Sequence, residues 1–352
     1  MPMDPTATAD PADRPGTGRT PCAQRDRTEP RGTGPHWYTA PLARPYGPRA
    51  AERFLRTGQD DPARASVLQA ARVLLHTGHP RRTVLWCGKL HRRARAVEAS
   101  GWESAFRALC SEALLHLGDL ASAEREAASA QHAAGARNTS LWLWPTAILA
   151  EALIAQGRHE EATAHLGQYA PAPVWQNLPW LRAQGRLHLA AHRHHDALAA
   201  FRTVGRLASW EGSVRLPHLP WRTDTAEALL QLGLVDEARA LLVEEVATVS
   251  GVVPRHQGIA LRLLARTEEP GARLHTLARA VTALRRCENR LEHAHALEDL
   301  GRALDTVGEN SLAAAFLRRA THLAADCGAP PPRDEMTATA TGPTQPMVPA
   351  RL

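Results

Sequence analysis

The chain has 352 residues, a formal net charge of +6 at pH 7 and a sequence pI of about 9.5. Lys89 is the one lysine among 42 basic residues and the arginines are dispersed, so the charge forms no stripe of the kind that binds nucleic acid. Aromatic residues make up only 5 %, β-branched runs are scarce, and no stretch approaches the roughly 18 apolar residues of a membrane span, which together predict an all-α fold outside the membrane.

We expect residues 1–58 to be a disordered tail, because they are rich in Pro, Gly, Thr, Asp and Arg and show little apolar periodicity. The first residues, "MPMDPTATADPADRPGTG", lack the apolar core of a signal peptide. The five cysteines of the chain are odd in number and widely separated, which indicates neither a disulfide framework nor a zinc site. These features favour a reducing cytoplasm as the location of the protein.

Residues 59–328 carry a nearly unbroken helical pattern that repeats along the chain. Each unit has a turn residue, with a small residue seven positions before it, in most units a leucine four before it, and a small residue five after it. The turn residues are Gly78, Gly118, Gly157, His192, Gly233 and Gly308. The last interval, 75 residues, is about twice the others and leaves room for one more unit, whose turn lies around Glu268–Gly271. We therefore expect about seven helical hairpins.

Two glycines of the last unit show what the pattern requires. Gly308 lies at the turn between two antiparallel helices, where a left-handed or tight backbone favours glycine. Gly301 lies inside a helix, where glycine costs about 1 kcal/mol relative to alanine. We expect this cost to be offset by close approach of the partner helix, on which Ala313 is also small. One hairpin cannot bury its apolar face alone, so the hairpins stack into a solenoid.

Two clusters in the pattern have a structural and a functional interpretation. The basic cluster consists of Lys89, His91, Arg92, Arg93 and Arg95. These side chains can contact phosphate, but without interleaved aromatic residues they are typical of a solvated helical face. The histidine cluster consists of His188, His192 and His195. On a continuous helix these histidines would share one face and could hold a metal, but the repeat template places a solvated turn at His192–His194.

Five tryptophans fall near the starts of first helices. They are Trp102, Trp142, Trp144, Trp180 and Trp221. Such residues pack between neighbouring hairpins or serve as ligand anchors in a groove. Because Trp142 and Trp144 cannot easily both point inward from one helix, we expect one of them to be an exposed anchor, and we assign Trp144 to the groove.

The first helices of stacked hairpins line a concave face, and the template places one position of each helix there, six residues before the turn. In five units this position is charged: Glu112, Glu151, Arg186, Glu227 and Arg302. General exposure of helix surfaces explains such charges, and so does a polar groove for a peptide or a partner helix. No G-x-S-x-G or H-E-x-x-H motif occurs, so we expect no enzyme activity, no cofactor and no metal.

The last unit, "LGRALDTVGENSLAAAFLRRA", is similar to the tetratricopeptide repeat. The matching residues are Leu300, Gly301, Leu304, Ala313 and Leu317, with leucine in place of the two aromatic residues of that repeat. The other units keep the small residues and leucines. The resemblance implies an all-α, tetratricopeptide-like solenoid that binds a protein or peptide in its concave groove.

Residues 222–328, with "RTDTAEALLQLGLVDEARALLVEEV" and "LEDLGRALDTVGENSLAAAFLRRATHLA", also resemble the helical region of large ATP-binding LuxR-type transcriptional regulators. In that family an ATPase precedes this region and a helix-turn-helix domain follows it. No G-x-x-x-x-G-K-[ST] occurs here, and Lys89 lies in "WCGKLHRR". Residues 329–352, which we expect to be a second disordered tail, are too few for a DNA-binding domain. The resemblance therefore implies the middle module alone.

Two functional hypotheses follow from these observations. The first is a regulatory protein–protein interaction module linked to transcription in a bacterium with a GC-rich genome, and without specific DNA binding of its own. The second is a scaffold or accessory protein for enzymes of secondary metabolism, with no role in transcription. The sequence leaves the partner, the regulated pathway and the oligomeric state open.

Overall fold

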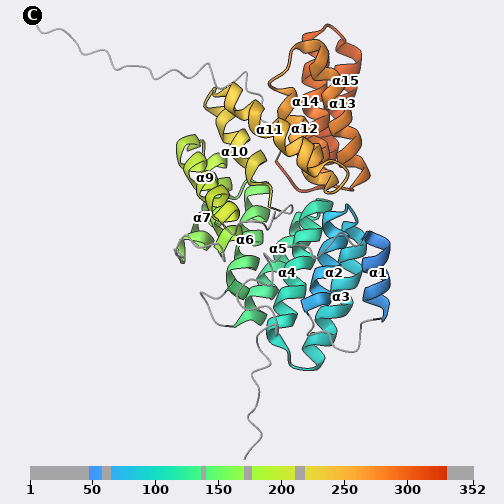
Figure 1. The fold of residues 1–352 in the computed structure, drawn as a ribbon, viewed down its shortest axis with the longest axis vertical. Helices are drawn as coiled ribbons and strands as arrows, with labels where there is room; N and C mark the ends of the chain where they lie inside the picture. The colour runs from blue at the N-terminus through green and yellow to red at the C-terminus, as the bar shows by residue number, and fades with distance from the viewer. Residues whose placement is uncertain (1–46, 58–64, 136–139, 170–176, 211–218, 331–352) are drawn as a thin grey trace, which may run out of the picture.

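The computed structural model describes residues 47–57, 65–135, 140–169, 177–210 and 219–330. In these ranges the chain forms fifteen helices and no strand (Figure 1). The helices are α1 (Pro48–Thr57), α2 (Ala65–His76), α3 (Pro80–Ala96), α4 (Ser100–Leu117), α5 (Leu120–Ala134), α6 (Ser140–Ala155), α7 (His159–Gly167), α8 (Leu178–Ala190), α9 (His194–Trp210), α10 (Trp221–Gln231), α11 (Val235–Val249), α12 (Pro254–Ala265), α13 (Pro270–Arg286), α14 (Arg290–Thr306) and α15 (Asn310–Asp326). Within the described ranges, no helix is long and apolar enough to cross a membrane.

Helices α2 to α15 pair in chain order as seven antiparallel hairpins, which confirms the number expected from the repeat. The turn residues have left-handed backbone conformations, with φ of 76° at Gly118 and 85° at Gly308. His192 takes the same conformation, with φ of 58°, although it is not a glycine. The extra hairpin is α12–α13, whose turn lies between Ala265 and Pro270. The chain is therefore an all-α, tetratricopeptide-like solenoid.

Helix α1 lies in the segment that the sequence predicts as a tail, so the predicted boundary at residue 58 is too far along the chain. Its short amphipathic pattern explains the helix, because Ala51 and Leu55 lie one turn apart and are both buried against α2. An ion pair of 3.1 Å between Glu52 and Arg82 also ties α1 to the first hairpin. Apart from Gly47, Ala329 and Pro330, the remaining residues of both predicted tails lie outside the described part of the chain.

Glycines inside the first helices allow the two helices of a hairpin to approach closely, as the sequence predicts. A Cβ atom added at Gly301 would lie 2.8 Å from Leu317 Cγ and 3.2 Å from the carbonyl oxygen of Ala313. At Gly185 an added Cβ would collide with the ring of Phe201, including Cδ1 at 2.7 Å. Phe201 is fully buried, so the missing side chain at Gly185 is what makes room for it.

The solenoid winds far enough for its C-terminal hairpins to lie against its N-terminal ones (Figure 1). A Cβ atom added at Gly78, in the loop between α2 and α3, would lie 3.0 Å from Cys287 Cβ at the end of α13. The turn residue of the next hairpin, Gly118, contacts Cys327 in the same way, at the end of α15. Arg81 Nε also lies 3.3 Å from a carboxylate oxygen of Glu288. With the two ends of the solenoid in contact, the first helix of each hairpin faces a central space.

Candidate functional site

Two adjoining chambers lie in this central space. The first chamber is lined by Arg72, His76, Glu112, Leu115, His116, Trp144, Ala147, Ile148, Glu151, Pro179, Arg182, Leu219, Pro220, Arg255 and His256. The second chamber is lined by Leu115, His116, Glu151, Ile154, Ala155, Arg182, Arg186, Pro220, Thr223, Asp224, Glu227, Arg255, Ile259, Arg262, Asn289, Leu291, Glu292, His295, Ala329 and Pro330. The volume open to the centre of a water molecule is about 80 Å³ in the first chamber and about 300 Å³ in the second.

Every helical residue that lines the two chambers comes from the first helix of a hairpin. The N-terminal hairpins contribute the ends of their first helices, including His76 of α2 and His116 of α4. The C-terminal hairpins contribute the beginnings, including Arg255 of α12 and Glu292 of α14. The chambers thus lie between the N-terminal and the C-terminal hairpins, where the two ends of the solenoid approach each other.

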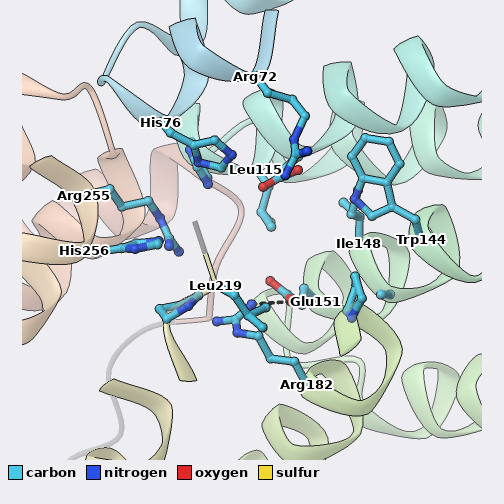
Figure 2. A pocket seen from close by; sticks show the side chains of 15 residues that line it. Arg72, His76, Leu115, Trp144, Ile148, Glu151, Arg182, Leu219, Arg255 and His256 are labelled. Atoms are coloured by element: carbon cyan, nitrogen blue, oxygen red, sulfur yellow. Dashed lines mark hydrogen bonds and ion pairs between the residues drawn. The ribbon is translucent and has the colours of Figure 1, made fainter. Parts of the chain in front are cut away.

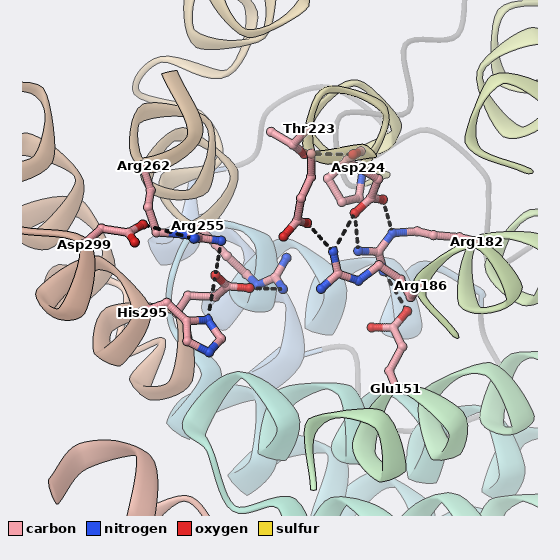
Figure 3. A network of polar contacts seen from close by, with 12 residues as sticks. Glu151, Arg182, Arg186, Thr223, Asp224, Arg255, Arg262, His295 and Asp299 are labelled. Carbon is pink, nitrogen blue, oxygen red and sulfur yellow. Dashed lines mark hydrogen bonds and ion pairs between the residues drawn. The ribbon is translucent and has the colours of Figure 1, made fainter. Parts of the chain in front are cut away.

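One side of the second chamber carries an ion-pair network that joins α6, α8 and α10 (Figure 3). Arg182 donates two hydrogen bonds to Asp224, of 2.5 and 3.1 Å, and a third of 2.6 Å to Glu151. Arg186 pairs with Glu227 at 2.5 Å. Burial lowers the pKa of Arg182, but the charges of Asp224 and Glu151 outweigh it and hold the guanidinium protonated. Arg182 and Asp224 therefore form a fixed, charge-compensated wall.

A second network faces the first across the chamber, from α12 and α14 (Figure 3). Arg262 donates a 3.2 Å hydrogen bond to Asp299 and lies 3.6 Å from Glu292. His295 Nδ1 also lies 3.6 Å from Glu292. Burial raises the pKa of Glu292, but the nearby His295 and the charge of Arg262 outweigh it and place the pKa well below its ordinary value. Glu292 is therefore ionised at neutral pH.

The first chamber has a different character, because His76 of α2 gathers with Arg255 and His256 of α12 on one side of it (Figure 2). Burial lowers the pKa of His76 well below its ordinary value, and the positive charge of Arg72 adds to this effect. The pKa of His116 is lowered in the same way, by burial first and then by Arg255. Both imidazoles are consequently neutral at pH 7. Trp144 and Ile148 form an apolar wall opposite them.

The structure brings together most of the residues that the sequence assigns to a groove. Glu112, Trp144 and Glu151 line the first chamber, and Glu151 also lines the second, with Arg186 and Glu227. Arg302 lines neither chamber: it pairs with Glu298 at 2.7 Å and its side chain is 42 % exposed. The reason is the pitch of the solenoid, since only the first half of α14 faces the chambers and Arg302 lies in the second half.

Sequence reasoning missed several lining residues that carry charge, among them Arg182, Asp224 and Arg255. The first two lie one helical turn before the predicted residues Arg186 and Glu227, so they share the same helix face. The spacing of three or four residues therefore indicates from the sequence that Arg182 and Asp224 also face the chambers. No spacing in the sequence indicates that Arg255 faces the chambers, because its position depends on how the N-terminal and the C-terminal hairpins meet.

The expectation that Trp142 or Trp144 is exposed is wrong, since each side chain is only 6 % exposed. The two residues belong to different hydrophobic clusters, on two sides of α6. Helix α6 contacts α4 and α5 on one side and α8 on the other, so both of its faces are buried. Trp102 and Trp180 are buried as well, and Trp221 is partly buried against the neighbouring hairpin.

The basic and histidine clusters lie away from the two chambers. Lys89, Arg92, Arg93 and Arg95 are exposed on α3, His91 is half-buried there, and the ammonium group of Lys89 lies 5.1 Å from the ring centre of Trp86. The histidine cluster spans the turn between α8 and α9, where His192 has left-handed geometry. No group of residues in the described part of the chain has the composition and spacing of a metal site.

Comparisons with known proteins give structural similarity only. No protein-family model and no curated protein sequence matches this chain significantly. The fold is similar to that of a Rap protein complexed with competence and sporulation factor, with a TM-score of 0.63, 12 % sequence identity, and coverage of 79 % of this chain and 80 % of that chain. It is also similar to a chain of the APC/C hetero-tetramer Cut9–Hcn1, with a TM-score of 0.56, 13 % identity, and coverage of 79 % and 50 %.

The two TM-scores establish the fold of this chain, and the low sequence identities identify no ligand for it. Both structures share with this chain the winding of stacked helical hairpins over most of the described residues, at identities too low to carry over a binding residue. The chain therefore has the fold of tetratricopeptide-like repeat solenoids.

Proposed function

We propose that this protein is a non-catalytic interaction module that binds a short peptide, or an extended segment of a partner protein, in its two central chambers. The observation that carries the proposal is the convergence of seven first helices on one charged, partly buried space. Opposed ion-pair networks line that space, and each is tied to the fold through buried side chains. A preorganised polar lining of this kind favours an extended ligand with hydrogen-bonding backbone groups.

The similarity to the Rap protein supports the proposal, because that protein was crystallised with competence and sporulation factor. The size of the chambers is also consistent with it, since a few residues of an extended peptide would fill them. The four cysteines in the described part of the chain are buried free thiols, in keeping with the reducing cytoplasm that we assume for the protein.

The proposal includes a regulatory role in transcription, which rests on the resemblance of residues 222–328 to the helical region of LuxR-type regulators. Any action on DNA would come through another chain or through a missing segment, since the sequence given contains no G-x-x-x-x-G-K-[ST] motif and no recognisable recognition helix. A comparison of transcripts between the wild-type strain and a strain lacking the gene tests this part. Unchanged transcripts would remove the link to transcription and leave the interaction module standing.

A scaffold for enzymes is the second candidate function, and exposed apolar side chains on the outer helices favour it. Leu85 on α3 is 67 % exposed, Val243 on α11 is 51 % exposed, and Leu312 on α15 is 49 % exposed. A folded enzyme would dock on such outer faces rather than enter the chambers. Under this alternative, partner binding would be lost in the triple variant Leu85→Ser, Val243→Ser, Leu312→Ser.

The proposed function is tested by selecting peptides of about ten residues from a random displayed library against the full-length chain. We expect enrichment of sequences that bind with dissociation constants in the micromolar range or below. Absence of enrichment above that obtained with an unrelated helical protein would contradict peptide binding.

A further inference from the structure

The chain reaches the wall of the second chamber directly after its last helix. Gly328 follows α15 in a left-handed conformation, with φ of 75°. The backbone N–H of Ala329 donates a 3.1 Å hydrogen bond to the carbonyl oxygen of Ala324, so this C-cap turns the chain away from the axis of α15. Ala329 and Pro330 then line the second chamber.

Pro330 is seated against the loop between α6 and α7. A Cβ atom added at Gly157, in that loop, would lie 3.4 Å from Pro330 Cγ, which is an ordinary van der Waals separation. This contact places at the chamber the point from which residues 331–352 continue. A segment tethered so closely to a site has an effective concentration there of about 1 mM.

The charges that line the second chamber balance one another. Among the described residues of this lining there are four arginines and four carboxylates: Arg182, Arg186, Arg255, Arg262, Glu151, Asp224, Glu227 and Glu292. Each arginine lies no more than 3.9 Å from a carboxylate. A further charge buried among these pairs would be left without a counter-charge, which is costly. The lining therefore favours an uncharged, extended segment.

The sequence that continues from Pro330 has this composition. Residues 331–352 lie outside the described part of the chain, and within them residues 336–350, "MTATATGPTQPMVPA", contain no charged side chain. Pro343, Pro346 and Pro349 recur every three residues, which is the period of an extended polyproline II helix, so binding in an extended form costs little further backbone entropy. Met336 follows Pro330 by six positions, and such a connection spans about 20 Å at most.

We propose that a few residues of segment 336–350 occupy the second chamber as an intramolecular ligand, which a partner peptide must displace. This inference rests on the proposed function, because it treats the chamber as a site for an extended segment. With an effective concentration of about 1 mM and a dissociation constant of about 0.1 mM for the tethered segment, the apparent affinity for a partner peptide is reduced about tenfold.

Photo-crosslinking of the full-length chain tests this occupancy without an added ligand. His295→p-benzoylphenylalanine places a photoreactive side chain at the rim of the second chamber, because His295 lines the chamber and its side chain is 44 % exposed. His322→p-benzoylphenylalanine is the control, since His322 is exposed near the end of α15, outside both chambers and closer to the segment along the chain. A segment free in solvent would react more with position 322.

We expect cross-links from position 295 to residues 336–350 of the same chain, in a yield at least about tenfold higher than from position 322. The yield should not depend on protein concentration. A higher yield from position 322 would overturn the intramolecular ligand, and so would cross-links formed only between two copies of the chain.

A pair of charged substitutions in the segment tests the chemistry of the contact. Thr339→Glu with Thr344→Glu should remove most of the cross-link from position 295 and raise the affinity of a selected partner peptide about tenfold. Thr339→Gln with Thr344→Gln is the matched control and should leave both quantities unchanged. Equal behaviour of the two pairs would overturn the intramolecular ligand and leave peptide binding standing. Failure to select any peptide, even against the Glu pair, would overturn the proposed function.

Discussion

Substitution of Gly185 by alanine tests the reason for glycine inside the first helices. An alanine Cβ would collide with the ring of Phe201, whose Cδ1 would lie 2.7 Å away. Phe201 is completely buried, so the ring has no free space to move into. Overpacking of this kind costs about 2–3 kcal/mol in a tight core. The better helix propensity of alanine returns about 1 kcal/mol. The net loss should therefore be about 1–2 kcal/mol.

The matched control is Gly88→Ala in the middle of α3, where an added Cβ would find only the Nη1 atom of Arg92 within contact, at 3.7 Å. Here the propensity gain is unopposed, so Gly88→Ala should stabilise by about 0.5–1 kcal/mol. Thermal unfolding should show Gly185→Ala melting about 2–4 °C below the wild type, and Gly88→Ala slightly above it. Stabilisation by both substitutions would refute the packing argument.

Three further predictions concern the turn, a buried carboxylate and nucleic acid. His192→Gly should raise stability in urea by about 0.5–1 kcal/mol, because a non-glycine residue at φ of 58° is strained; a lower stability would mean that the imidazole itself supports the turn. Burial raises the pKa of Glu245 to about 7, so its favourable contribution is present below the ordinary carboxyl pKa and is lost as the pH rises toward 7. Glu245→Gln should therefore exceed the wild type in stability near pH 8 and lose this advantage near pH 4, and a difference independent of pH would contradict the assignment. Duplex DNA should bind weakly and without sequence preference, with binding lost between about 50 and 200 mM salt, and selective binding that persists at the higher salt would restore a DNA-binding regulator.

The repeat template predicts what depends on contacts within a hairpin. Left-handed turns at Gly118 and Gly308, and close packing at Gly301, follow from the spacing of small residues and leucines. These features are local, because each hairpin forms its contacts with its own helices and its neighbours. The same locality accounts for the place of Glu151 and Glu227 in the lining of the second chamber.

The template does not predict what depends on the winding of the whole solenoid. Arg302 occupies the same place in its unit as Arg186, yet it lies outside the chambers because the last hairpin meets them only with the start of α14. Arg255 lines both chambers for the same reason, through a contact between turns of the superhelix. The pitch accumulates from small rotations between hairpins, and single-residue spacing carries little information about it.

Occupation of the central chambers is the claim on which the account depends, and a blocking substitution tests it most directly. Ala155 lines the second chamber at the end of α6 and is only partly buried, so Ala155→Trp would place an indole in the space proposed for the peptide. Ala199→Trp on the exposed face of α9 is the control, with the same change in side chain away from the chambers. For a peptide obtained by selection against the full-length chain, calorimetric titration should show binding to Ala199→Trp at the wild-type affinity and loss of binding by at least about a hundredfold to Ala155→Trp. Equal affinity of the two variants would contradict binding in the chambers.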